Sequence, residues 1–147
     1  FLLLKLPAAY FSGLRVKAID EQHSVVTVPY KWFSTNPFRS TYFACLSMAA
    51  EMSTGVLAML HTYRHKPPIS MLVVRVDAAY CKKATGVTYF TCVEGKMMQM
   101  AVEKAVSEGT AQTFTARSTG KNKAGEVVAE LLITWSFKLK AGKEGIH

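Results

Sequence analysis

The feature that most constrains the fold is a long apolar stretch between Arg39 and Arg64 that contains a single charged residue, Glu51. From Tyr42 to Leu60, apolar side chains occupy almost every direction around a helical wheel. A helix that is apolar on all sides must be buried on all sides. The sequence therefore predicts a long central helix that the rest of the chain encloses.

The ends of this stretch carry signals that predict where the helix begins and ends. Asn36-Pro37 can start it, and Ser40-Thr41 offers a second N-cap one turn later. At the other end a basic run suits the helix dipole, and Pro67-Pro68 prevents continuation. We expect the helix to start within Asn36–Tyr42 and to end within Leu60–Lys66.

A membrane-spanning helix is the first alternative, because about 20 apolar residues can cross a bilayer. However, Ser47, Glu51 and Ser53 lie near the middle of the stretch, where an acid costs about 2.5–3.5 kcal/mol on insertion. We therefore expect no membrane span. A chain of 147 residues that is 50% apolar can bury one core, so we expect a single domain, 1–147.

Charge and cysteine content narrow the choice of partners and compartment. The net charge of +8 suits an anionic partner where cations cluster, as at Arg64–Lys66 and at Lys121 with Lys123. No basic run alternates with stacking aromatics as in a nucleic-acid module, so we expect no nucleic acid. A small phosphorylated ligand and a solvated basic surface both fit. Three cysteines without a C-x-x-C pair indicate a reducing compartment, and we expect a cytoplasmic protein.

The segments around the central helix are typical of antiparallel strands. Two β-branched runs before it predict a hairpin, and a short helix should precede them. The expected elements are a helix at Leu6–Gly13, strands at Leu14–Asp20, Ser24–Tyr30, Ser70–Cys81, Gly86–Glu94, Thr110–Thr119 and Glu126–Lys140, and a surface helix at Lys96–Glu108. In the strand at Ser70–Cys81 we expect one apolar, buried face, formed by Leu72, Val74, Val76, Ala78 and Tyr80.

An α+β chain with an antiparallel sheet wrapped around a long central helix resembles the hotdog fold. Small acyl-CoA thioesterases of that fold carry an Asn ahead of the helix, a His-Gly-Gly-like turn at its start and an acid two turns inside it. Here Asn36, Tyr42-Phe43-Ala44 and Glu51 fall at matching spacings. The chain is more similar still to a less characterised thioesterase-like branch that uses Glu as the acid. It departs from the larger family in placing Tyr42 where that family has His.

The resemblance implies hydrolysis of acyl-CoA or of a related acyl-carrier thioester. Glu51 would be the catalytic carboxylate, as general base or nucleophile, and Asn36 and Tyr42 would orient water or substrate. The backbone N–H groups of Phe43 and Ala44 would hold the oxyanion. No cofactor is implied beyond the coenzyme A moiety of the substrate. A purely structural Glu51, paired with a cation from a strand, is the alternative.

Basic residues outside the helix are candidates for contacts with the phosphates of a coenzyme A-like ligand. They form two pairs, Arg64 with Lys66 and Lys121 with Lys123. The resemblance also implies a homodimer or a dimer of dimers, because this family builds its sites across a subunit interface. The strand at Ser70–Cys81 is long enough to pair with its own copy.

The sequence is also compatible with two non-catalytic functions, and it contains one pair of histidines that could suggest a metal site. The replacement of His and Gly by Tyr42 and Phe43-Ala44 fits a non-catalytic hotdog protein that only binds acyl ligands. A cystatin-like or nuclear-transport-factor-like small-molecule binding domain also wraps a sheet around a helix, usually with the helix ahead of the strands. His61 and His65 share a helix face, but without a cysteine or a paired acid nearby we expect no metal site.

Overall fold

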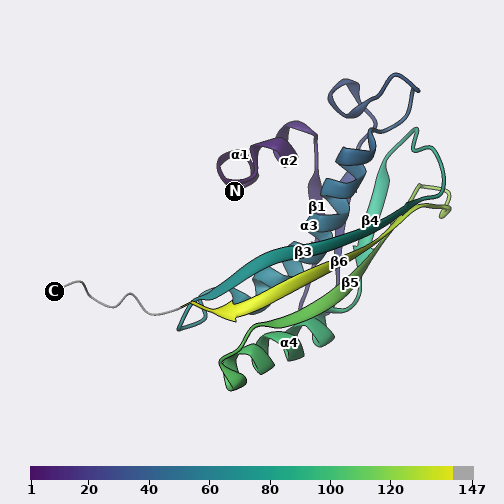
Figure 1. The fold of residues 1–147 in the computed structure, drawn as a ribbon. Helices are drawn as coiled ribbons and strands as arrows, with labels where there is room; N and C mark the ends of the chain where they lie inside the picture. The colour runs from purple at the N-terminus through teal and green to yellow at the C-terminus, as the bar shows by residue number, and fades with distance from the viewer. Residues whose placement is uncertain (141–147) are drawn as a thin grey trace.

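The computed structural model describes residues 1–140, and residues 141–147 of the expected domain lie outside this range. Figure 1 shows a long helix, α3, lying against one face of a twisted sheet, with α4 near one end of it and the short helices α1 and α2 beside it. The elements in chain order are α1 (Leu2–Lys5), α2 (Pro7–Phe11), β1 (Arg15–Ile19), β2 (Ser24–Val28), the 3-10 helix η1 (Trp32–Ser34), α3 (Phe43–Thr62), β3 (Ile69–Tyr80), β4 (Thr88–Cys92), α4 (Gly95–Glu108), β5 (Gln112–Lys121) and β6 (Val127–Leu139).

The six strands form one antiparallel sheet in the order β1-β2-β4-β5-β6-β3. The β1–β2 hairpin precedes α3 and joins the sheet that α3 packs on. This arrangement is the α+β hotdog fold, as expected, and its element order separates it from the cystatin-like alternative. The sequence did not predict α1 or η1.

The start of α3 differs from the expectation. Its first helical residue is Phe43, one position beyond the expected window, and its last is Thr62, inside it. Neither Asn36 nor Ser40-Thr41 caps the helix, and the N-cap residue Tyr42 makes no side-chain cap bond. The reason is that Thr41 is held in extended backbone, where its N–H donates to the carbonyl of Ala84 at 2.8 Å and it bridges to Thr35. The helix can begin only after this bridge.

The apolar surface of α3 is explained largely by packing within the domain. Although α3 is long and apolar enough to cross a membrane, 56% of its most apolar window is buried. The prediction that the helix is buried on all sides was nevertheless wrong, because Phe43, Met59 and Leu60 are 55%, 39% and 44% exposed. A single sheet covers one side of a helix, and α4 and the short helix α2 contact only parts of the remaining surface.

Polar side chains in the middle of α3 attach it to the sheet. Ser53 Oγ shares a hydrogen bond of 2.6 Å with Ser118 Oγ of β5, and Ser24 of β2 donates to the Ser53 carbonyl. The indole N–H of Trp135 on β6 donates to Thr54 Oγ1 at 2.8 Å. Because buried polar groups must be paired, these bonds fix the rotation of α3 on the sheet and thereby the direction in which Glu51 points.

The sequence assigned the wrong face of β3 to the core. Met71 and Val73 pack against the core, whereas the expected buried set is exposed: Leu72, Val74, Val76, Ala78 and Tyr80. Alternation separates two faces of a strand without showing which face another element covers. In addition, β3 is an edge strand with a bulge between Val73 and Arg75 that shifts its register against β6.

Candidate functional site

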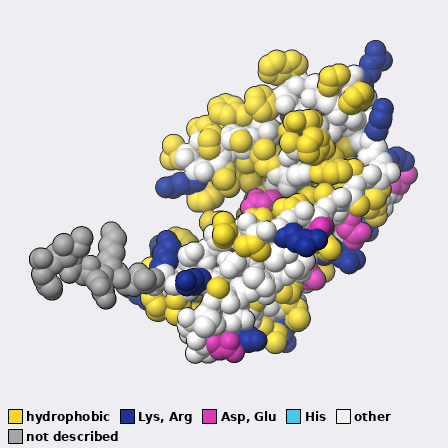
Figure 2. Space-filling view, viewed as in Figure 1, with side chains coloured by type: hydrophobic (Ala, Val, Ile, Leu, Met, Phe, Trp, Pro, Cys, Tyr) yellow, Lys and Arg dark blue, Asp and Glu magenta, His cyan; other side chains and the backbone are white. Residues whose placement is uncertain are grey.

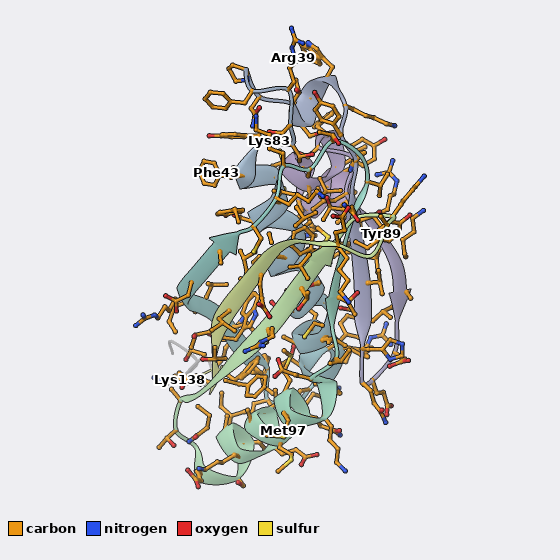
Figure 3. The ribbon with its side chains drawn as sticks, turned by 90° about the vertical axis from the view of Figure 1, so that its right-hand side faces the viewer. Arg39, Phe43, Lys83, Tyr89, Met97 and Lys138 are labelled. Atoms are coloured by element: carbon orange, nitrogen blue, oxygen red, sulfur yellow. The ribbon has the colours of Figure 1, made fainter. Side chains whose placement is uncertain are left out.

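The predicted residues ahead of the helix meet in one groove at the N-terminal end of α3. This first groove has a volume of about 740 Å³. It is lined by Asn36, Tyr42 and Phe43, together with Tyr80 from the end of β3 and Lys82-Lys83 just after it. Figure 3 shows Phe43 and Lys83 at this end of the domain, with Arg39 on the loop beyond them.

The backbone at the start of α3, beside this groove, offers free donors. Neither the N–H of Phe43 nor that of Ala44 donates a hydrogen bond to another group within residues 1–140. The first N–H groups of a helix carry the positive end of its dipole and suit an oxyanion. Asn36 is largely occupied by its own loop, since its Oδ1 accepts from the N–H of Phe38 at 2.9 Å and its Nδ2 donates to Ser40 Oγ at 3.1 Å. An amide nitrogen has a second N–H, which leaves Asn36 one donor.

Glu51 lies in a different pocket. This second pocket has a volume of about 780 Å³ and is formed by α3, the N-terminal helices, β1, the start of β3 and Trp135. Figure 2 shows apolar side chains on both sides of a hollow between the N-terminal helices and β3, with an acidic group inside it. Glu51 and Arg15 are the charged residues of a lining that is otherwise mostly apolar.

The Glu51 carboxyl is in an unusual electrostatic position. Burial raises its pKa above the ordinary value of a glutamate, because an apolar pocket disfavours the charged form. It forms no salt bridge with any residue of the described range, and Arg15, although it lines the same pocket, is not within ion-pair distance. The alternative in which Glu51 is half of a structural ion pair therefore finds no support in residues 1–140.

Gly55, one turn after Glu51, keeps the floor of this pocket open. A Cβ at Gly55 would lie 3.2 Å from Trp135 Cζ2 and 3.6 Å from Glu51 Oε1. The absence of a side chain there lets the Trp135 ring lie close against the helix, whereas such a Cβ would make only an ordinary contact with the carboxylate. Nothing in the sequence signalled this contact, since it joins residues far apart in the chain.

The two sites are separated within one subunit. Glu51 is eight residues along α3 from Phe43, which is about 12 Å of helix. Between them Ser47 Oγ and the Tyr80 hydroxyl share a short hydrogen bond, and the Tyr80 ring packs against Phe43 with centroids 5.9 Å apart. The structure thus brings Asn36, Tyr42 and Phe43 together but not Glu51.

The candidate phosphate-binding residues also fall into two places. Arg64 and Lys66 follow the C-terminal end of α3, whereas Lys121 and Lys123 lie at the β5–β6 turn, near the other end of the domain. Lys123 lines another pocket together with Thr85, which belongs to the same loop as Lys83. Lys82 and Lys83 were missed as site residues, although the sequence shows them directly after a strand. Lys82 pairs with Glu126, and no salt bridge forms at Lys83 within the described range.

The two histidines at the end of α3 are engaged with backbone. A ring nitrogen of His61 lies 3.0 Å from the Glu21 carbonyl oxygen, and His65 Nδ1 lies 2.7 Å from that of Pro67. Among the described residues there is no group of three or more His, Cys, Asp or Glu side chains suited to a metal ion.

Comparison with known proteins extends these observations. The family model for a domain of unknown function, DUF4442, matches residues 2–137. No curated protein matches the sequence. Three solved structures have the same fold. PA5026 from Pseudomonas aeruginosa, a protein of unknown function and probable thioesterase, is 20% identical over 92% of this chain and 89% of that chain, with a TM-score of 0.80. OLEI01261 from Chlorobaculum tepidum, of unknown function, is 15% identical over 95% of this chain and 91% of that chain (TM-score 0.83), and the thioesterase HI1161 from Haemophilus influenzae is 12% identical over 97% and 90% (TM-score 0.69).

Proposed function

Since the chain belongs to the DUF4442 family and has the hotdog fold, we propose that it hydrolyses acyl thioesters, with coenzyme A or an acyl carrier as the thiol. The observation that carries this proposal is Glu51, a carboxyl without an ion pair in residues 1–140, set in an apolar pocket of about 780 Å³. Leaving a lone acid half-buried costs stability, so its presence indicates a functional role. A carboxyl with a tuned pKa is one such role.

The chemistry assigned to Glu51 is activation of water. The carboxylate accepts a proton from a water molecule as its oxygen attacks the thioester carbonyl carbon. The carbonyl oxygen becomes negative and requires N–H donors. Collapse of this intermediate breaks the C–S bond, and the protonated Glu51 gives its proton to the departing sulfur, so that the thiol and a carboxylic acid are released. Direct attack by Glu51, with an anhydride that water then hydrolyses, uses the same residues.

The oxyanion donors we assign are the N–H groups of Phe43 and Ala44, supplied by a second subunit. Within one subunit they are too far from Glu51 to act on the same carbonyl group. The exposed edge strand β3, with Leu72, Val74 and Val76 on its surface, is suited to pairing with its copy. Antiparallel pairing about a two-fold axis reverses α3 between the subunits, which turns the N-terminal end of one helix toward the middle of the other.

Asn36 and Tyr42 belong to the same end of α3 and would orient the attacking water or the thioester through the free amide N–H and the phenol hydroxyl. We place the reaction in the cytoplasm, which suits three cysteines that form no disulfide. No cofactor beyond the coenzyme A moiety of the substrate is required by this scheme.

The test is a thioesterase assay with acyl-CoAs, comparing the wild type with Glu51→Gln. The glutamine retains the shape of the side chain but cannot accept a proton, so we expect hydrolysis to fall by roughly a hundredfold or more, which is about 2.7 kcal/mol of barrier. Circular dichroism should show an unchanged fold. Equal rates would remove Glu51 from the mechanism, and a wild type that binds acyl ligands without hydrolysing any would instead identify a binding protein.

A further inference from the structure

The second pocket is elongated along α3, with Glu51 at one end. From Glu51 its helical wall continues through Met52, Gly55 and Val56 to Met59. The opposite wall comes from the N-terminal segment, through Leu2, Leu3, Leu6 and Tyr10. Beyond Glu51 toward Met59 the α3 wall carries no charge, so this part of the pocket suits an uncharged, flexible chain.

We infer that this pocket binds a straight acyl chain of about ten carbons and that the N-terminal helices α1 and α2 set its length limit. The inference rests on the proposed function, because it takes the carbonyl group of the thioester to lie at Glu51. The chain would then run toward Met59 beneath α1 and α2.

The length follows from the helix. The eight residues from Glu51 to Met59 rise about 12 Å. An extended alkyl chain advances about 1.3 Å per carbon, given a C–C bond near 1.5 Å at tetrahedral angles. Nine or ten carbons therefore reach Met59. The volume of about 780 Å³ lies within the range usual for small-molecule pockets.

The N-terminal helices bury few of their own side chains, and their apolar side chains at the pocket remain available to contact a ligand. α1 has four residues and buries none of them, and α2 buries only Ala9. Leu3 and Leu6 line the pocket yet remain 49% and 44% exposed. Apolar side chains directed at a pocket gain contacts from an alkyl chain that the domain itself does not supply.

Binding of thioether analogues of acyl-CoA, which cannot be hydrolysed, tests the inference separately from the reaction. Calorimetry with analogues from butyl to hexadecyl should show affinity rising by roughly fourfold for each added methylene and then levelling near ten carbons. An affinity that does not change with the length of the alkyl chain, or no binding of any analogue, would overturn the inference. Binding with this profile but without thioester hydrolysis would refute only the proposed reaction.

Two substitutions with matched controls locate the limit. Leu6→Trp, in the N-terminal segment, should shift the levelling point to chains shorter by two or three carbons, whereas Leu4→Trp, at an 84% exposed position outside the lining, should not. Met59→Trp should also shorten the profile, and Leu60→Trp, its exposed neighbour outside the lining, should not. A shift with Met59→Trp but not with a folded Leu6→Trp would show that α1 and α2 do not set the limit. If neither changes the profile, the chain does not occupy this pocket.

Discussion

Glu51 is the residue on which the proposed chemistry depends. It is the one acid on an otherwise apolar helix, and its environment keeps it from an ion pair in the described residues. Burial disfavours the charged carboxylate more than the neutral acid and therefore raises the pKa of Glu51. A base that must be deprotonated to act will lose activity as the pH falls through this raised pKa.

The pH dependence of kcat/KM should therefore show an acid limb at a higher pH than an ordinary glutamate, whose pKa is about 4.3, would produce. The direction follows from burial, which favours the neutral, inactive form of Glu51. Stopped-flow or plate assays across the acidic range measure it. An acid limb at or below the ordinary value would contradict the assignment.

Stability provides a control that does not involve turnover. With a raised pKa, the folded state holds the Glu51 proton more tightly than the unfolded state does. Unfolding free energy therefore falls as the pH rises from the unfolded pKa through the folded one. Glu51→Gln should lack this fall, so its melting temperature should exceed that of the wild type at neutral pH and approach it in acid.

The N-terminal end of α3 lacks a side-chain cap and carries free N–H donors. The chain enters the helix from extended backbone at Tyr42, where φ is −60° and ψ is 132°. This is the conformation that a residue before proline prefers, and proline is tolerated at the first helical position. The N–H of Phe43 can therefore be deleted with little damage to the helix.

Phe43→Pro removes this N–H and the ring, whereas Phe43→Ala removes only the ring. If the N–H stabilises the oxyanion, kcat should be roughly a hundredfold lower in the proline variant than in the alanine variant, with similar melting temperatures. Steady-state kinetics of the two proteins side by side give the ratio. Equal kcat values would place the oxyanion elsewhere.

For the whole molecule, the arrangement of the sites makes dimerisation testable by function. In a two-fold dimer with shared sites, a subunit carrying Glu51→Gln and one carrying Phe43→Pro would together form one intact site. Mixing the two inactive variants should then restore roughly a quarter of wild-type activity, since half of the dimers are mixed and each has one good site of two. Light scattering should show a dimer, or a dimer of dimers. Without recovery in mixtures that exchange subunits, the site would not be shared.

The two basic pairs lie at different ends of the domain and can therefore show where the coenzyme A moiety binds. An acyl chain directed toward Met59 leaves the coenzyme A moiety to extend the other way, over the end that carries Lys121 and Lys123. Reversing that pair with Lys121→Glu and Lys123→Glu should raise KM several-fold and make KM less sensitive to salt, with kcat little changed. Arg64→Glu with Lys66→Glu is the matched control. An increase in KM with the Arg64 and Lys66 substitutions alone would instead place the phosphates of coenzyme A at the C-terminal end of α3.

Several features of this protein follow from the sequence alone. The apolar run around Glu51 predicted the central helix. Pro67-Pro68 limited its predicted end to a range that contains the observed last residue, Thr62. The final strand was evident because every odd position from Val127 to Leu139 is apolar. These signals are local, since the periodicity of side chains and the chemistry of chain breaks are set by neighbouring residues.

Tertiary structure decided which of these residues share a site and which faces are covered. The wrong assignment of Leu72 and Val76 to the core, and the separation of Asn36 and Phe43 from Glu51, both depend on where a strand or helix lies relative to elements distant in sequence. The pocket around Glu51 depends on Gly55, Trp135 and the N-terminal leucines, which the chain brings together only by folding. Residue spacing measures distance along one element, whereas a site is built from distances between elements, and these are determined by packing.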